Sequence, residues 1–402
     1  MGRERIQILD GGMGTTLEAL GHSVNSELWG SELLYTNPKI MANIHEKYVQ
    51  AGADLVETCT YQLTSENLTN YLNSNESSSD DPTTSDELFY KSIDLVDCAF
   101  KKNNINSINQ GVVFSCGPFG STLKPGAEYS GIYPFPFGPI SNQQNSFNKE
   151  DKLLEKQSIE LLSKFHFEKL LKIALNKEIW KKIKWIGFET IPLIYEIKSI
   201  RLAIGKLNKI LKNKYKEEKE EQNWFLKKFW ITSPFPNSNF PQIDLNGNHI
   251  TIKELINNLI DYNYNNEIET ENDEYPIPNG IGINCTNPSY LFELSKQFTN
   301  ILKEKNEIKQ NSISFILYPD GGQIYDVITR SWSIPKNEFN SNSNEWSKGI
   351  LKIIKKIENS KQDNGEYIWK SIIVGGCCKT SFNEIKSLKM NLDNMYGEVK
   401  SI

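Results

Sequence analysis

The sequence predicts an α/β fold in which eight parallel strands alternate with helices and close into a (β/α)₈ barrel of the TIM type. Eight short apolar runs alternate with longer amphipathic segments along the chain, the order that a parallel sheet with helical crossovers requires. Polar and small residues follow most of these runs directly. No dinucleotide-binding fingerprint follows the first run, because Gly11-Gly12-Met13-Gly14-Thr15-Thr16 lacks its glycine spacing. The open doubly wound sheet is therefore the second choice.

The strands are expected where short runs rich in β-branched and aromatic residues end at polar residues or glycine. These runs are Ile6–Asp10, Asp54–Thr58, Val112–Cys116, Trp185–Glu189, Phe229–Ser233, Ile281–Cys285, Ser314–Tyr318 and Ile372–Gly375. The helices are expected between them, where apolar residues recur at helical spacing. The segments are Pro38–Gln50 with Asn37 as its cap, Ser85–Lys101, Lys152–Lys177, Ile194–Lys212, Ile252–Tyr262, Ser289–Lys303, Glu345–Ile357 and Phe382–Lys389.

Three polar stretches are expected to be solvated loop insertions in one barrel domain that spans residues 1–402. They are residues 73–86, 214–223 and 262–274, which are rich in Ser, Asn, Glu and Lys. Such composition buries too little apolar surface to order itself, and insertions of this kind are tolerated between elements. A further long connection, Phe135–Asp151, is expected on or beside the face where the strands end.

The composition excludes several classes of function. Hydrophobic residues make up 38% and charged residues 24% of the chain, and the net charge is −5, so neither nucleic acid nor a membrane is an expected partner. No run approaches the 18 apolar residues of a membrane span. The first apolar run begins at Ile6, which leaves no room for a signal peptide. We expect a cytoplasmic protein that is a monomer or a small homo-oligomer.

Five of the six cysteines lie at the ends of predicted strands, where Cys59 and Cys116 are ambiguous and the other three share one context. Cys285 ends one strand, and Cys377 and Cys378 follow Gly375-Gly376 after another. The two tips are next-but-one neighbours in a barrel. Three thiols without a fourth suit a soft metal ion with an open coordination position, as in catalytic zinc sites. A redox disulfide between Cys377 and Cys378, or simple burial, are the alternatives. Cys98 lies in a helical pattern and is expected to be buried.

In a (β/α)₈ barrel the carboxyl ends of the strands form the working face. A metal held by three thiolates can also bind a substrate thiol, which ionises once it is coordinated. Asp10 and Glu189 follow other strands at that face and could hold the ammonium group of an amino acid. Backbone N–H groups of Gly11-Gly12, or near Thr58, could bind its carboxylate. The alternative for Glu189 is a salt bridge at the barrel rim.

These segments resemble the homocysteine S-methyltransferase family of zinc-dependent barrels. The matching blocks are Asp10-Gly11-Gly12-Met13-Gly14-Thr15, Glu57-Thr58-Cys59-Thr60-Tyr61-Gln62, Gly117-Pro118-Phe119-Gly120, Glu128-Tyr129-Ser130-Gly131-Ile132-Tyr133, Phe188-Glu189-Thr190-Ile191-Pro192, Gly282-Ile283-Asn284-Cys285-Thr286, Tyr318-Pro319-Asp320-Gly321-Gly322 and Gly375-Gly376-Cys377-Cys378. They occur in family order from residue 8 to about residue 385. The pair formed by Asn-Cys-Thr and Gly-Gly-Cys-Cys is highly specific.

The resemblance implies an enzyme that transfers a methyl group to L-homocysteine and forms methionine. By the same resemblance Cys285, Cys377 and Cys378 hold Zn²⁺ and carry the catalysis through it. Asp10 and Glu189 would bind the homocysteine amino group, with Thr58 and the Gly11-Gly12 turn near its carboxylate and Tyr61 also in the site.

The form of the second block, Thr58-Cys59-Thr60-Tyr61-Gln62, resembles the branch that uses the sulfonium donors S-methylmethionine and S-adenosylmethionine. A donor whose positive charge disappears on transfer suits an apolar or aromatic pocket. Candidates for that pocket are Tyr61, Phe119, Tyr129, Tyr133 and Trp332. The alternatives are a betaine-using enzyme and a non-catalytic barrel that senses homocysteine or zinc.

Overall fold

The computed structural model describes residues 3–74, 83–104, 109–216, 223–261, 274–305, 312–326, 331–333 and 342–397, with the backbone alone at 324–326 and 331–333. Its main sheet has eight strands in the order β1-β10-β7-β6-β5-β4-β3-β2, and each neighbouring pair is parallel. The strands are β1 (Ile6–Ile8), β2 (Leu55–Glu57), β3 (Gly111–Cys116), β4 (Ile183–Phe188), β5 (Lys228–Ser233), β6 (Gly280–Asn284), β7 (Ser314–Tyr318) and β10 (Ile372–Val374).

Contacts between β1 and β2 close the sheet on itself. Leu9 and Leu55 form a parallel bridge, and the Asp54 N–H donates to the Ile8 carbonyl oxygen at 2.7 Å. The Asp54 carboxylate also accepts a hydrogen bond from the Ile8 N–H at 2.8 Å. The predicted (β/α)₈ barrel is thus confirmed.

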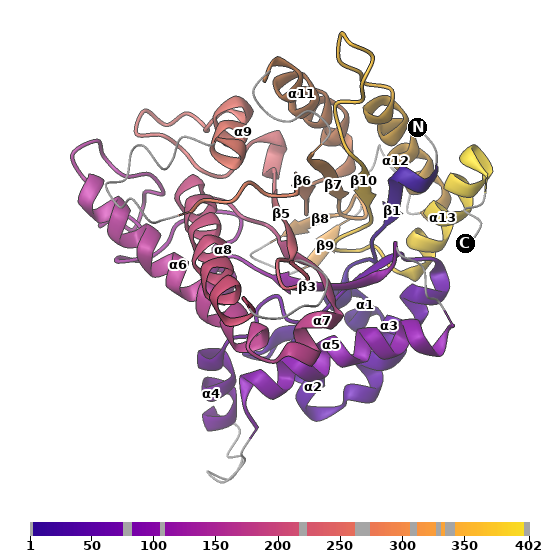
Figure 1. Cartoon of the computed structure of the whole chain (residues 1–402), viewed down its shortest axis with the longest axis horizontal. Helices are drawn as coiled ribbons and strands as arrows, with labels where there is room; N and C mark the ends of the chain where they lie inside the picture. The colour runs from indigo at the N-terminus through magenta and orange to yellow at the C-terminus, as the bar shows by residue number, and fades with distance from the viewer. Residues whose placement is uncertain are drawn as a thin grey trace.

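Helices surround the barrel (Figure 1) and pack their apolar faces against the outer face of the sheet. Those that cross between strands are α3 (Pro38–Ala51), α5 (Ser85–Lys102), α6 (Lys152–Ala174), α8 (Ile194–Lys214), α9 (Ile252–Ile260), α11 (Leu291–Glu304) and α12 (Ser343–Glu358), and α13 (Phe382–Tyr396) follows the last strand. Pro38 begins α3 as predicted, but the Asn37 side chain makes no capping hydrogen bond.

Several short elements were not predicted. These are α1 (Met13–Ala19), α2 (Glu32–Thr36), α4 (Ser65–Ser74), α7 (Lys177–Lys182) and the antiparallel pair β8 (Ile324–Asp326) and β9 (Ser331–Ser333). The helix predicted over Lys152–Lys177 is wrong at its end. It stops at Ala174, and the Asn176 side chain accepts a hydrogen bond from the Ile179 N–H, which caps α7.

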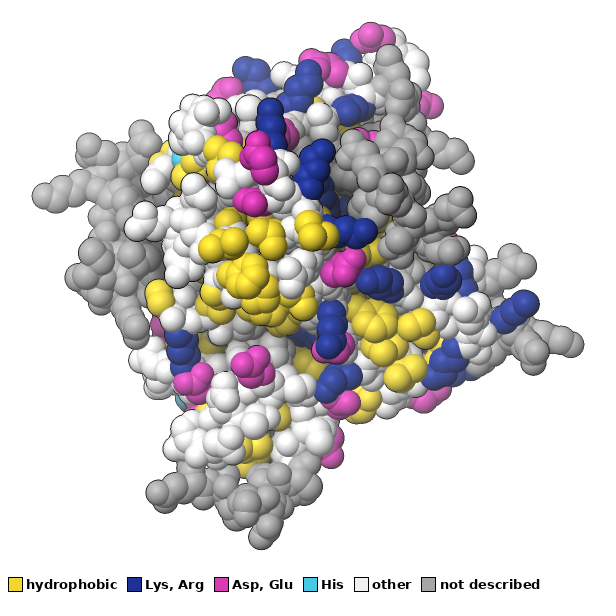
Figure 2. All heavy atoms as spheres, turned by 90° about the vertical axis from the view of Figure 1, so that its left-hand side faces the viewer, with side chains coloured by type: hydrophobic (Ala, Val, Ile, Leu, Met, Phe, Trp, Pro, Cys, Tyr) yellow, Lys and Arg dark blue, Asp and Glu magenta, His cyan; other side chains and the backbone are white. Residues whose placement is uncertain are grey.

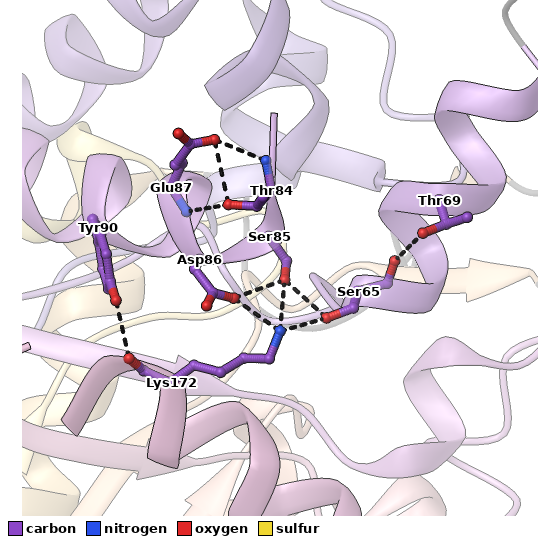
Figure 3. Close-up of polar contacts among 8 residues, drawn as sticks. All are labelled: Ser65, Thr69, Thr84, Ser85, Asp86, Glu87, Tyr90 and Lys172. Atoms are coloured by element: carbon purple, nitrogen blue, oxygen red, sulfur yellow. Dashed lines mark hydrogen bonds and ion pairs between the residues drawn. The ribbon is translucent and has the colours of Figure 1, made fainter. Parts of the chain in front are cut away.

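The predicted insertions lie largely at 75–82, 217–222 and 262–273, outside the described residues. The first is shorter than predicted, because residues 73 and 74 end α4 and α5 begins at Ser85. Figure 3 shows contacts of α4 and α5, the helices on either side of this insertion: at the start of α5, Thr84 and Glu87 form a capping box. Beside it, the Lys172 ammonium donates to Asp86 at 2.8 Å and to Ser65 at 2.9 Å. These contacts hold α4, α5 and α6 together at the base of the insertion.

Large apolar side chains fill the inside of the barrel. They are Leu9, Leu55, Val113, Trp185, Trp230, Ile316, Tyr318 and Ile373. The Trp185 and Trp230 ring centroids are 5.5 Å apart. Glycine is required beside them, since a Cβ on Gly187 would lie 2.9 Å from the Trp230 ring. This filling closes the interior, so a substrate can enter only at an end of the barrel.

The outer surface mixes charges of both signs. On the side that faces left in Figure 1, Lys and Arg side chains stand among Asp and Glu around a central group of hydrophobic side chains (Figure 2). Within the described ranges, no helix combines the length and apolar character needed to cross a membrane.

Candidate active site

Polar side chains collect inside the barrel at the carboxyl ends of the strands. Side chains alternate between the two faces of a strand, so Glu57 and Ser115 follow the interior residues Leu55 and Val113 on the inner face. Asp10 lies two residues after β1 and Glu189 directly follows β4, and they are only 2% and 7% exposed. The carboxyl ends of β1, β2 and β4 thus bring together three buried or partly buried carboxyl groups.

The three predicted thiol residues meet at the same end of the barrel. Their sulfurs all lie within 4.8 Å of one another, because β6 and β10 flank β7 as next-but-one neighbours. In the structure the Cys285 and Cys377 sulfurs are joined as a disulfide, and the Cys378 sulfur lies 4.0 Å from that of Cys377. The pairing considered from sequence, Cys377 with Cys378, is therefore not the one formed.

Once reduced, this cluster fits a soft metal ion. Three sulfur donors from two strand tips converge, and this donor set is typical of zinc. Burial, with Asp320 and Glu189 adding to it, raises the pKa of the Cys378 thiol to about 12. A bound cation would reverse that shift by stabilising the thiolate. The side chains of Thr190 and Asn284 also donate toward the Cys285 sulfur, at 3.7 and 3.3 Å.

A side-chain pairing between two strand tips holds Cys285 in place. The Asn284 amide accepts a hydrogen bond from the Thr190 N–H at 2.9 Å and donates to the Thr190 hydroxyl at 2.7 Å. Both Thr190 and Cys285 have left-handed backbones, with φ of 62° and 45°, which is strained for a β-branched residue such as threonine. Strain of this kind clusters at functional sites. Neither Asn284 nor Thr190 was predicted as a site residue, although both lie in motifs that contain predicted site residues.

The glycines around Cys377 allow close backbone packing. A Cβ on Gly12 would lie 2.3 Å from the Cys377 carbonyl oxygen, and one on Gly376 would lie 2.2 Å from the Thr380 hydroxyl. The Gly12 N–H donates to the Thr380 carbonyl oxygen at 2.9 Å. The Gly11-Gly12 turn therefore lies directly against the loop that carries Cys377 and Cys378.

The buried carboxyl groups perturb one another. Burial raises the pKa of Glu189 to about 7, while a hydrogen bond from the Ser115 hydroxyl and the charge of Lys169 oppose the rise. Burial also raises the pKa values of Asp10 and Glu57 well above their usual range, and the neighbouring carboxylates add to the effect. Lys169, from α6, donates to the Thr60 carbonyl oxygen at 2.6 Å. The site thus gathers three carboxyl groups where water has little access, and a bound cation would favour their ionised forms.

Thr58 and Tyr61 lie beside these carboxyl groups. The Thr58 hydroxyl accepts a hydrogen bond from the Ser115 N–H at 3.0 Å and lies 2.7 Å from the Thr60 hydroxyl. Tyr61 forms a hydrogen bond with Thr190. Burial raises the pKa of Tyr61 well above its usual range, and the charges of Glu128 and Glu189 add to the rise. The structure therefore places both residues at the mouth of the barrel.

The connection from β3 to α6 covers one side of the mouth. Glu196, fully buried on α8, accepts hydrogen bonds from the Phe119 N–H at 2.7 Å and the Tyr133 hydroxyl at 2.5 Å. The His166 Nε2 atom lies 3.0 Å from the same carboxylate. Between these anchors lies Tyr129, whose side chain is 42% exposed as a whole. Burial around its hydroxyl raises its pKa well above the usual range, and the charges of Cys378 and Glu128 add to the rise.

The aromatic residues expected to line the donor pocket divide into two groups. Tyr133 is fully buried, and Phe119 stacks on Phe137 with ring centroids 4.1 Å apart, so both support the loop from within. Tyr61 and Tyr129 remain at the mouth. The side chain of Trp332 lies outside the described residues.

The other cysteines lie apart from the three clustered thiols. Cys59 and Cys116 are buried and Cys98 is exposed, so the expected burial of Cys98 is wrong. The buried face of α5 contains Val96, Ala99 and Phe100. Cys98 is two positions from Val96 and from Phe100, which turns it about 200° away around the helix.

We expect kcat/KM for an amino-acid substrate to fall as the pH drops below about 7. An ion pair with the substrate ammonium needs the ionised form of Glu189, and its raised pKa of about 7 means that acid removes this form near neutrality. Ser115→Ala removes a donor to the carboxylate and should move this limb to higher pH. A profile that is flat from about pH 6 to 8, or one that Ser115→Ala leaves unmoved, would contradict the assignment.

A closed parallel barrel with three convergent thiols and buried carboxyl groups at its mouth could hold a soft metal ion beside a substrate that carries an ammonium group. The chain belongs to the homocysteine S-methyltransferase family, whose model matches residues 7–392. This match confirms both the resemblance and the prediction that the chain is an enzyme.

Named relatives agree with this assignment. Homocysteine S-methyltransferase 2 of Zea mays is 26% identical over 96% of this chain and 89% of its own length. Homocysteine S-methyltransferase 1 of Arabidopsis thaliana is 24% identical over 96% and 93%. Among solved structures, the metallated and oxidized forms of the homocysteine methyltransferase MmuM from Escherichia coli have TM-scores of 0.56 and 0.59. Each is 19% identical and covers 96% of both chains, so this likeness shows the fold.

Proposed function

We propose that the protein transfers a methyl group from S-methylmethionine, or from S-adenosylmethionine, to the thiol of L-homocysteine, and that Zn²⁺ on Cys285, Cys377 and Cys378 is required. This proposal depends mainly on one observation: a carboxylate suited to an amino group and the thiol cluster lie next to each other at the same barrel mouth. Glu189, a carboxylate for the amino group, is followed by Thr190, whose hydroxyl lies 3.7 Å from the Cys285 sulfur. An amino acid with a short thiol side chain can span the two.

Different residues at the mouth bind different groups of the substrate. Asp10 and Glu189 hold the homocysteine ammonium through charge-assisted hydrogen bonds. The Gly12 N–H is already donated to Thr380, so the Gly11 N–H is the amide of this turn that we assign to the substrate carboxylate, with Thr58 nearby. The zinc ion, when bound, lowers the pKa of the homocysteine thiol, which makes it a thiolate at neutral pH.

The transfer itself is a displacement at carbon. The homocysteine sulfur forms a bond to the methyl carbon, while the bond from that carbon to the donor sulfur breaks and its electron pair stays on the donor. S-methylmethionine thereby becomes methionine, as homocysteine does. The donor loses its positive charge in this step, so aromatic faces that stabilise a cation without binding it permanently suit the donor. We assign that role to Tyr61 and Tyr129.

A donor panel tests this function. The reduced, zinc-loaded protein is incubated with homocysteine and, in separate reactions, S-methylmethionine, S-adenosylmethionine or betaine, and methionine is quantified. We expect methionine from the sulfonium donors, fastest from S-methylmethionine. Turnover with betaine alone would overturn the donor assignment, and no turnover with any donor would favour a non-catalytic sensor.

A further inference from the structure

Glu57 has no role in the reaction described so far. It ends β2, and the alternation of side chains along the strand places it inside the barrel, one layer nearer the mouth than Leu55. Its N–H donates to the Asp10 carboxylate at 3.1 Å. The two residues are therefore fixed side by side beneath the mouth.

Two buried oxygens of this pair lack a hydrogen-bond partner among the described residues: Asp10 Oδ1 and Glu57 Oε1. Asp10 is only 2% exposed, and burial raises the pKa of Glu57, with the charges of Glu189 and Asp10 adding to the rise. Unsatisfied buried acceptors are costly. Their presence indicates that a donor group arrives with a ligand.

The buried lysine of this region, Lys169, lowers the pKa of Glu189 by its charge but directs its N–H donors to other groups. The Lys169 ammonium donates to the backbone oxygens of Thr60 and Tyr61, at 2.6 and 3.4 Å. An amino-acid ammonium is a compact cation with three N–H donors, like that of lysine. Three carboxyl groups therefore match its donors one to one.

We propose that Glu57 is a third ligand of the substrate ammonium group, so that Asp10, Glu57 and Glu189 each accept one of its N–H donors. This inference rests on the proposed function and adds a residue that selects for a free, charged α-amino group. It predicts strong discrimination against thiols of the same length that lack the amino group.

The test compares L-homocysteine with 4-mercaptobutyrate, which is homocysteine without its amino group. Binding of each to the reduced protein is measured by calorimetry for the wild type and for Glu57→Gln, which keeps the size of the side chain and removes its charge. We expect Glu57→Gln to weaken homocysteine binding about 10–100-fold and to leave 4-mercaptobutyrate within about twofold. Glu57→Asp, which keeps the charge on a shorter chain, should recover part of the loss.

Glu358→Gln is the matched control, because Glu358 is also buried, at 6% exposed, but is bonded to Tyr396 on the outer helices. Equal losses for both ligands, or no loss for either, would overturn the role of Glu57. In those cases methionine formation by the wild type would leave the proposed function intact. A wild type that forms no methionine and does not prefer homocysteine over 4-mercaptobutyrate would overturn both. If Glu57→Gln does not fold, the same comparison with Glu57→Asp decides.

Discussion

Cys378→Ser is expected to abolish both zinc binding and methyl transfer while leaving the barrel folded. A hydroxyl is a poor replacement for a thiolate ligand to zinc, and a site with two remaining thiols loses most of its affinity. We expect the zinc content of the reduced protein to fall from about one per chain to below about a tenth, and methionine formation to fall at least about 1,000-fold. The same result is expected for Cys285→Ser and Cys377→Ser, because all three sulfurs lie within 4.8 Å of one another.

Cys98→Ser is the control for these variants, since Cys98 is exposed on α5 and lies outside the cluster. It should keep both zinc and activity. Full zinc retention in any one of the three ligand variants would remove that residue from the proposed metal site.

The second large effect is expected for Glu189→Gln. The variant keeps the size of the side chain but replaces a charge-assisted bond to the ammonium with a neutral one. KM for homocysteine should rise about 10–100-fold, while KM for the methyl donor changes little. The acid limb of the pH profile should also move, because the carboxyl group that titrates near pH 7 is gone while Asp10 and Glu57, whose pKa values are also raised, remain.

Ser115→Ala serves as the graded comparison for Glu189→Gln. It removes only the hydroxyl that donates to the Glu189 carboxylate, so its effect on KM should be smaller and in the same direction. Unchanged kinetic constants in Glu189→Gln would show that Glu189 does not bind the substrate.

Much of the fold could be predicted because each strand of the barrel is marked twice, by an apolar run and by the polar residues after it. The strand ends were placed slightly too late. Asp10, Thr58, Glu189 and Cys285 lie just beyond their strands, where the ladder ends and the chain turns. At Cys285 the turn has a φ of 45°, which sequence periodicity does not reveal.

The short helices were harder to predict for a different reason. α7 depends on the Asn176 cap within a continuous apolar pattern, and α4 is held by contacts of Lys172 with Ser65 and Asp86. Such contacts join segments far apart in the sequence. Local pattern alone therefore extended the predicted helix past the end of α6 and missed both α7 and α4.

The residues of the candidate site could also be predicted only in part. The thiols and the two carboxylates Asp10 and Glu189 lie at strand tips, where their position alone indicated a function. Glu57 could have been recognised from its alternation with Leu55. Glu196 and Lys169 could not, because they lie on helices among core residues and reach the site only through tertiary contacts. What the sequence does not specify is mainly this supporting layer.

The most direct test of the account is a zinc titration of the reduced, metal-free protein, with methionine formation from homocysteine and S-methylmethionine measured at each step. If the three thiols hold a required zinc ion, activity rises in proportion to added zinc and levels off at about one ion per chain. Methionine formed at the full rate without zinc would contradict the account. So would one bound zinc ion per chain with no methyl transfer from a sulfonium donor.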